Sequence, residues 1–162
     1  FAAHGSGPDE PARIYLGGDD GTVAAVDPGT GETQWSDDPG AYADADTVVG
    51  IEQAGETVVV RKWRSLYGFD AATGEERWRQ VLAPFETLTR PVVVGDTVCL
   101  LHAPTAEAAV VKTFDLATGR RQWKQDVGTA DRFPETAAFA GRYVVANDGS
   151  LYGFDVGGAG AG

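Results

Sequence analysis

The sequence predicts an all-β fold: a β-propeller segment of about four blades, each blade a four-stranded antiparallel sheet. Three observations predict it, namely a motif that recurs at nearly constant spacing, runs of β-branched and aromatic residues between its copies, and turn residues that bound these runs. A fixed period of about 20–50 residues is the signature of a repeat architecture. Four short strands per repeat are the content of a propeller blade.

The recurring motif is centred on an aspartate. Successive aspartates are separated by 43, 45 and 40 residues, so the period holds to within a short loop insertion. In the first three copies, the aspartate is followed by Thr-Gly and, four residues after that glycine, by a tryptophan. The motif residues are Ala25, Asp27, Gly31 and Trp35 in the first copy, Gly68, Asp70, Gly74 and Trp78 in the second, Asp115, Gly119 and Trp123 in the third, and Asp155 in the fourth.

Each motif residue has a mechanical reason to recur. The aspartate side chain accepts hydrogen bonds from backbone N–H groups of the turn, and the glycine supplies the positive φ that the returning strand needs. We expect the tryptophan on the outermost strand, where its ring covers the turn of a neighbouring blade. A small residue two positions before the aspartate leaves room for that ring; these residues are Ala25, Gly68, Thr113 and Gly153.

The strand pattern gives the expected limits of the blades. We expect blade 1 at about 1–36, blade 2 at about 47–80, blade 3 at about 90–125 and a partial blade 4 at about 135–156, followed by a Gly/Ala tail at 157–162. Blade 1 has only residues 1–4 available for its innermost strand. Blade 4 has candidates for three strands and none for a fourth. Both end blades are therefore predicted to be incomplete.

Composition excludes some classes of partner. The formal net charge is -11, which repels nucleic acid and anionic lipid headgroups. The sequence has no apolar run of the ~18 residues that a membrane helix needs. The single cysteine, Cys99, lies between Val98 and Leu100 and is predicted to be a buried, inert thiol. His4 and His102 are too isolated to indicate a metal site, and the Asp-Gly segments at 17–21 and 147–149 fit hairpin turns better than calcium loops.

The repeat resembles that of the PQQ-like propeller family. The frame Ala-x-Asp-x-x-Thr-Gly-x-x-x-Trp is similar to the tryptophan-docking repeat of quinoprotein alcohol dehydrogenases, BamB-type assembly lipoproteins and propeller sensors of bacterial kinases, and the resemblance covers residues 13–155. It implies a ring of seven or eight blades, of which this chain is an arc. In the dehydrogenases it implies bound PQQ and calcium, with a vicinal disulfide over the cofactor in many of them. Cys99 alone cannot form that disulfide.

Two regions are candidate binding surfaces. The longer connections at 36–46, 80–89, 102–109 and 125–135 are expected on one face of the propeller, and binding residues concentrate on such loops. The segment Arg61, Lys62, Trp63 and Arg64 lies outside the repeat frame, and exposed tryptophan and arginine are enriched at interfaces. We expect this segment to contact an acidic partner. In the alternative interpretation, the indole packs over a neighbouring blade and the cations pair with local carboxylates.

The function predicted from these features is a noncatalytic binding scaffold without a cofactor, for protein–protein interaction or for extracellular sensing or assembly. Its partners would be a protein or further propeller blades, with a homo-oligomer as one possibility, and its expected location is extracellular, on the cell surface or periplasmic. One alternative is a fragment of a PQQ-dependent dehydrogenase. Another is a structural subunit that pairs edge to edge into a ring or filament, because unpaired strand edges accept further strands.

Overall fold

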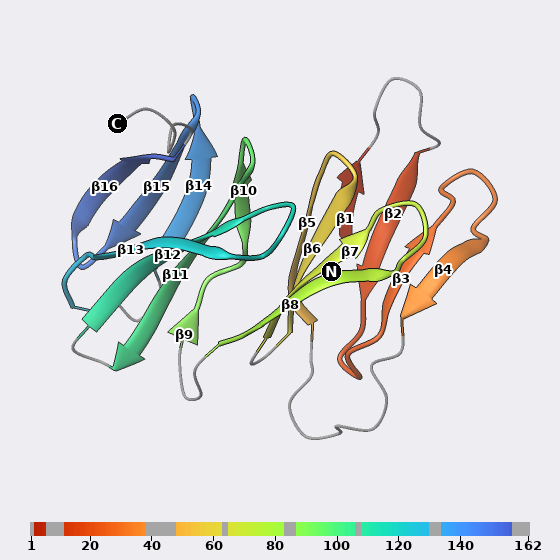
Figure 1. Cartoon of the computed structure of the whole chain (residues 1–162), viewed down its shortest axis with the longest axis horizontal. Helices are drawn as coiled ribbons and strands as arrows, with labels where there is room; N and C mark the ends of the chain where they lie inside the picture. The colour runs from red at the N-terminus through yellow and green to blue at the C-terminus, as the bar shows by residue number, and fades with distance from the viewer. Residues whose placement is uncertain are drawn as a thin grey trace. The chain divides into compact units, whose positions relative to one another are not determined.

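The computed structural model describes residues 2–5, 12–37, 48–62, 65–82, 87–105, 108–129 and 134–156. Within these residues every regular element is a β-strand (Figure 1). The chain divides into two compact units, Phe1–Leu82 and Ala83–Gly162. None of the described residues forms a helix that is long and apolar enough to cross a membrane.

The first unit contains two four-stranded antiparallel sheets. In each sheet, the strands are hydrogen-bonded in chain order, so every connection joins adjacent strands. One sheet is β1 (Ala2–Gly5), β2 (Arg13–Gly17), β3 (Val23–Val26) and β4 (Thr33–Asp37); the other is β5 (Val48–Ala54), β6 (Thr57–Lys62), β7 (Ser65–Asp70) and β8 (Glu76–Val81).

The second unit contains a five-stranded and a three-stranded sheet. The five-stranded sheet is β9 (Thr87–Leu88), β10 (Val92–Val94), β11 (Thr97–Thr105), β12 (Ala108–Asp115) and β13 (Arg121–Asp126), with β9 paired to the far end of β11. The three-stranded sheet is β14 (Glu135–Phe139), β15 (Arg142–Asn147) and β16 (Ser150–Asp155). Among the described residues, no fourth strand follows β16.

The predicted fold class is confirmed: the chain is all-β and built from antiparallel sheets of the propeller-blade type. The prediction that both end blades are incomplete is wrong for the first blade, because β1 pairs with β2 along its whole length and completes a four-stranded sheet. Two of the predicted loop segments are wrong in part. Strands β11 and β12 extend through much of 102–109, and β9 forms within 80–89 by pairing with His102 and Ala103. The extension of β11 provides the extra backbone edge to which β9 binds. Residues 38–47, 83–86, 106–107 and 130–133 of the predicted long-loop face lie outside the described residues.

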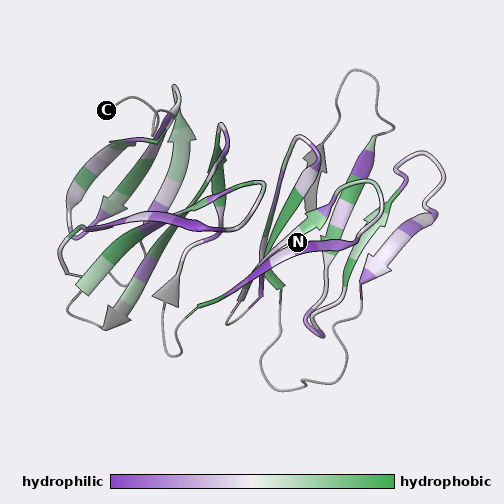
Figure 2. Ribbon diagram, viewed as in Figure 1, coloured by the Kyte–Doolittle hydropathy of each residue, from purple (hydrophilic) through white to green (hydrophobic). Residues whose placement is uncertain are grey.

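Each unit has its own apolar core between its two sheets. In the first, side chains from all the strands β2–β7 pack together, including Tyr15, Trp35 and Phe69. In the second, the core includes Val111, Tyr143 and Val145, with Trp123 and Phe154 packed at its margin. The outermost strands β8 and β13 are mostly hydrophilic, as Figure 2 shows, and most of their side chains are exposed. In these two sheets the outermost strand is therefore polar and the apolar side chains lie on the strands behind it.

Candidate functional site

The aspartate turns have the geometry that the motif predicts. Asp27 Oδ1 accepts hydrogen bonds from the backbone N–H groups of Gly29 and Thr30, at 2.7 and 2.8 Å. Asp70 makes the equivalent pair of bonds in the second copy, at 2.9 and 2.8 Å. Backbone hydrogen bonds hold the pKa of both carboxyls below its usual value. The glycines that close the three complete turns, Gly31, Gly74 and Gly119, all have positive φ.

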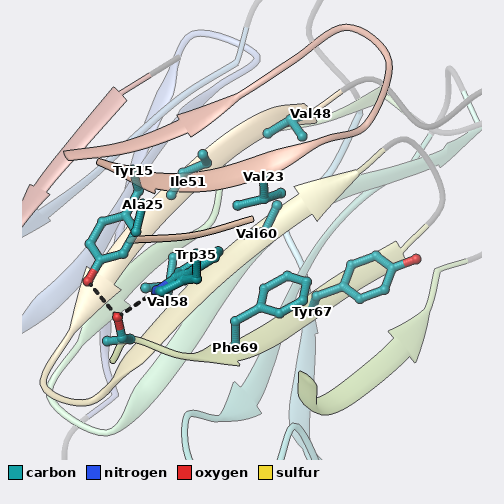
Figure 3. Close-up of a cluster of buried hydrophobic side chains, with 11 residues drawn as sticks. Tyr15, Val23, Ala25, Trp35, Val48, Ile51, Val58, Val60, Tyr67 and Phe69 are labelled. Carbon is teal, nitrogen blue, oxygen red and sulfur yellow. Dashed lines mark hydrogen bonds between the residues drawn. The ribbon is translucent and has the colours of Figure 1, made fainter. Parts of the chain in front are cut away.

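Trp35 joins the two sheets of the first unit. Its indole Nε1 donates a hydrogen bond of 3.0 Å to the carbonyl oxygen of Ala71, in the turn after β7, and the Tyr15 hydroxyl donates to the same oxygen at 3.3 Å (Figure 3). The ring also lies against Gly74, where a Cβ atom would approach ring carbons to 2.6 Å. The contact therefore requires both the turn carbonyl and the absence of a side chain at position 74.

The other two motif tryptophans have different surroundings. Trp78 is 7% exposed and lies opposite Gly68 of its own sheet, where a Cβ atom would overlap the indole. Trp123 is half-buried, and its ring centroid is 5.7 Å from that of Phe154, with the rings tilted by 43°. A small residue opposite the tryptophan thus makes room for the ring within the same sheet in the second copy.

The cationic segment at 61–64 is only partly described. Arg61 and Lys62 are 6% and 0% exposed, which differs from the exposure expected of an interface that binds acidic groups. Lys62 Nζ lies 3.6 Å from Asp37 Oδ2 and 4.9 Å from the centre of the Tyr67 ring. Burial lowers the pKa of Arg61 to about 10. Lys62 therefore pairs with a local carboxylate, while Trp63 and Arg64 lie outside the described residues.

The last sheet has one exposed face. Side chains on one side of β14–β16 point into the core of the second unit, among them Tyr143 and Phe154. The opposite side, which we call the open face, carries apolar and charged residues. It is formed by Glu135, Ala137, Phe139, Arg142, Val144, Ala146, Leu151, Gly153 and Asp155, and Arg142 pairs with Asp155 beside Phe139. Phe139 is 74% exposed and Leu151 is 75% exposed. The missing fourth strand that the sequence predicts concerns the edge of β16 and not this face, so it is not a signal for the exposure of Phe139.

In the part of the chain that the structure describes, the reactive side chains are not gathered at one place. Among the described residues, no group of three or more His, Cys, Asp or Glu side chains could hold a metal ion. Burial raises the pKa of the Cys99 thiol to about 12. His102 is 3% exposed, and its Nε2 lies 3.0 Å from Lys112 Nζ. Burial, together with this cation, lowers the pKa of His102 to about 4.

The sheets and their tryptophan–turn contact define the class: this is a β-propeller protein of the PQQ-like repeat type. The family model described as outer membrane protein assembly factor BamB matches residues 19–159, and the chain belongs to this family. The resemblance predicted from the sequence is therefore confirmed. No curated protein sequence matches the chain.

Solved propeller structures are similar to the chain. BamB from Moraxella catarrhalis is 20% identical with a TM-score of 0.70, over 91% of this chain and 47% of that one. Sqt1 from Saccharomyces cerevisiae is 16% identical with a TM-score of 0.65, over 89% and 40%. The quinohemoprotein alcohol dehydrogenase from Comamonas testosteroni is 26% identical with a TM-score of 0.57, over 70% and 19%. This chain spans about half the length of the BamB structure it matches.

Proposed function

We propose that this chain is a noncatalytic scaffold that binds a protein partner through the open face of β14–β16. The observation that carries the proposal is the exposure of Phe139 and Leu151 on one side of a sheet whose other side is buried. The two side chains lie at diagonal corners of the open face, with Ala137, Val144 and Gly153 in the row between them. Exposed apolar surface of this kind in a folded protein marks an interaction site or an aggregation hazard. Membership of the family described as an assembly factor supports the first of these. It also supports action outside the cytoplasm, in the periplasm or at the cell surface.

Site-specific photo-crosslinking tests this proposal. A photoreactive phenylalanine analogue is placed at position 139 or 151 in the protein expressed in its own organism, with Lys124 on the exposed strand β13 as the control position. We expect the same protein to crosslink at 139 and 151 and not at 124. Crosslinking that is no stronger at 139 and 151 than at 124 would contradict the proposed surface.

A quinoprotein dehydrogenase fragment is the second candidate, favoured by the similarity to the Comamonas enzyme. The residues present do not fit its cofactor site: Cys99 is the only cysteine, it is buried, and the described residues offer no cluster of metal ligands. A ligand that binds the native state raises its melting temperature by mass action. A clear rise on addition of PQQ and calcium would favour the dehydrogenase, and we expect none.

A structural subunit that assembles edge to edge is the third candidate. It is favoured by the outer edge of β16, which pairs with no strand among the described residues. Unpaired edges are templates for strand addition. Sedimentation over a range of concentrations separates this candidate from the scaffold, since only assembly gives dimers or longer species of the chain alone.

A further inference from the structure

The outer strands β8 and β13 have the same register but differ in charge. On β8, Glu76 lies opposite Phe69 and Arg79 lies opposite Tyr67, with a bulge in the pairing between the two rows. Residues directly opposite each other share a face of the sheet. The bulge therefore brings Glu76 and Arg79, which are three residues apart, to neighbouring rows of one face.

This arrangement neutralises the cation on β8. The Arg79 guanidinium donates two hydrogen bonds to the Glu76 carboxylate, from Nε at 3.3 Å and from Nη2 at 2.7 Å. Its carbon also lies 5.0 Å from the centre of the Tyr67 ring. The exposed arginine of the second sheet thus has a carboxylate and an aromatic ring within its own sheet.

The third sheet has cations at the corresponding positions. On β13, Arg121 lies opposite Phe114 and Lys124 lies opposite Lys112, again with a bulge between the two rows. Arg121 therefore stands where β8 has its glutamate, and Lys112 stands where β7 has its tyrosine. Both Arg121 and Lys124 are exposed. Like charges that face each other in a sheet are unfavourable, so this face is suited to an added negative charge.

The described residues of the second unit provide no carboxylate to these two cations. Neither Arg121 nor Lys124 forms an ion pair within them. The acidic side chains at the ends of β12 and β13 serve their own turns instead, because Asp115 and Asp126 each accept a backbone N–H hydrogen bond of 2.8 Å. A carboxylate that neutralises this face therefore comes from outside the unit.

We propose that Arg121 and Lys124 bind a carboxylate of an extended acidic segment in a protein partner. The carboxylate takes the place that Glu76 has beside Arg79 and forms charge-assisted hydrogen bonds with both cations. Strand β13 is the outermost strand of its sheet, and among the described residues no strand covers its outer edge. Nucleic acid is less suitable, because its continuous charge is repelled by a chain of net charge -11. This surface lies on another sheet than the open face and goes beyond the proposed function.

The probe is a synthetic decapeptide that alternates glutamate and threonine, since threonine favours an extended chain. It is titrated into the full 162-residue chain, and binding is followed by the amide NMR shifts. We expect saturable shifts centred on β13, with binding that weakens as salt is added. A matched peptide with glutamine in place of glutamate should bind at least about fivefold more weakly, because hydrogen bonds to ionised groups are stronger than those to neutral groups.

Single substitutions test the two cations. Arg121→Gln and Lys124→Gln should each lower the affinity for the peptide at least about fivefold, because a hydrogen bond to a charged group is lost. The matched control is Gln34→Glu on the exposed strand β4, which makes the same change in net charge and should alter the affinity by less than about twofold. Arg121→Glu gives β13 the charge pattern of β8, so it should abolish binding without lowering the melting temperature.

Each of several results would overturn the inference. These are no saturable binding, equal affinities for Arg121→Gln and Gln34→Glu, and tighter binding of a short DNA duplex than of the peptide at β13. A marked loss of stability in Arg121→Gln would show that the chain itself supplies the carboxylate. Self-association that Arg121→Gln abolishes would place it in a second copy.

The crosslinking test of the open face is independent of these results. A phenylalanine analogue at position 124 removes the Lys124 ammonium group that the acidic segment needs, so that position remains a valid control. If the peptide binds at β13 while positions 139 and 151 give no crosslink, the proposed function fails and the acidic-segment site stands. The opposite pair of results leaves the open face as the binding surface and overturns the site on β13.

Discussion

The two pairs of sheets differ in how a tryptophan meets the neighbouring turn. In the first unit, Trp35 donates its indole hydrogen bond to the carbonyl oxygen of Ala71, the residue after the motif aspartate. In the second, the corresponding carbonyl is that of Val156, and it accepts a hydrogen bond from the Thr97 hydroxyl at 3.3 Å. Trp123 lies instead beside Phe154 and stays half-buried.

This difference follows from the turn that receives the tryptophan. Asp70 holds a complete Asp-x-x-Thr-Gly turn, which fixes the Ala71 carbonyl and ends in Gly74 under the Trp35 ring. After Asp155 the sequence has Val156 and then only glycine and alanine, without the threonine that caps the turn. A tryptophan is therefore well anchored where the next sheet has its own full motif, so neighbouring blades stabilise one another as a unit.

The largest expected effect is on the free energy of unfolding when the anchored tryptophan is removed. Trp35→Ala deletes a ring that is 8% exposed, with its hydrogen bond, and should destabilise the first unit by about 3–5 kcal/mol. Trp123→Ala, at the half-buried site, should cost about 1–3 kcal/mol in the second unit. Urea denaturation followed by circular dichroism measures both. Equal losses would contradict the difference in anchoring.

A second comparison concerns two buried basic side chains, Lys62 in the first unit and His102 in the second. The expected effect is on the free energy of unfolding as a function of pH. Lys62 faces a carboxylate, whereas His102 faces the Lys112 ammonium, and burial with this cation holds the pKa of His102 at about 4, below its ordinary 6.5. Between pH 4 and pH 6.5, His102 is protonated in the unfolded chain and neutral in the folded chain. Stability is therefore complete above pH 6.5 and falls as the pH decreases toward 4, by about 1–3 kcal/mol.

The variant His102→Gln isolates this effect, because glutamine cannot be protonated and retains hydrogen-bonding groups. Denaturation midpoints measured at several values from pH 7.5 down to about pH 4.5 should fall less steeply for the variant than for the unmodified chain. Parallel curves for the two proteins would show that the pKa of His102 is the same in the folded and the unfolded chain, which would contradict this prediction.

The sequence was sufficient to predict the local features of the fold. The strands and Asp-x-x-Thr-Gly turns depend on short-range chemistry that recurs with the period, so Asp27, Asp70 and their glycines could be read directly. Burial of Arg61 and Lys62 could not be predicted in this way. Lys62, for example, lies against Asp37 of another sheet and the rings of Tyr67 and Phe69, and such contacts leave no local pattern in the sequence.

The open face was only partly predictable for a similar reason. The missing fourth strand of the last copy is visible in the sequence, and the structure agrees with it within the described residues. The exposure of Leu151 could not be predicted from its own segment, because the identical hexapeptide Ser-Leu-Tyr-Gly-Phe-Asp is mostly buried in β7 and mostly exposed in β16. Strand β9 was missed since a two-residue strand has no periodicity, and it is defined only by its pairing with β11.

Two glycine substitutions should separate the loss of the tryptophan contact from backbone strain, with a smaller effect on the free energy of unfolding. Gly74→Ala places a Cβ atom against the rigid Trp35 ring at a φ of 76°, and we expect a loss of about 2–3 kcal/mol. The control Gly95→Ala has a φ of 61° with nothing within 4 Å of the new atom, so it carries only the strain of about 1–2 kcal/mol. Thermal or urea unfolding of both variants gives the difference. Identical losses would mean that the ring moves aside without cost.

The smallest expected effect concerns the buried ion pair of the first unit. Asp37→Asn keeps the shape of the side chain but removes the charge that faces Lys62, and because Asp37 is 35% exposed we expect a loss of only about 1 kcal/mol. Lys62→Met keeps an unbranched apolar stem against Tyr67 and Phe69 and removes the need to bury an ammonium group, so its stability should equal or exceed that of the unmodified chain.

In the double variant the Asp37→Asn loss should disappear, because no buried charge remains to be compensated. Urea denaturation of the four proteins measures the coupling. If Lys62→Met is itself strongly destabilised, the ammonium group contributes to stability through contacts other than Asp37, and the pair cannot be the reason that this cation is buried.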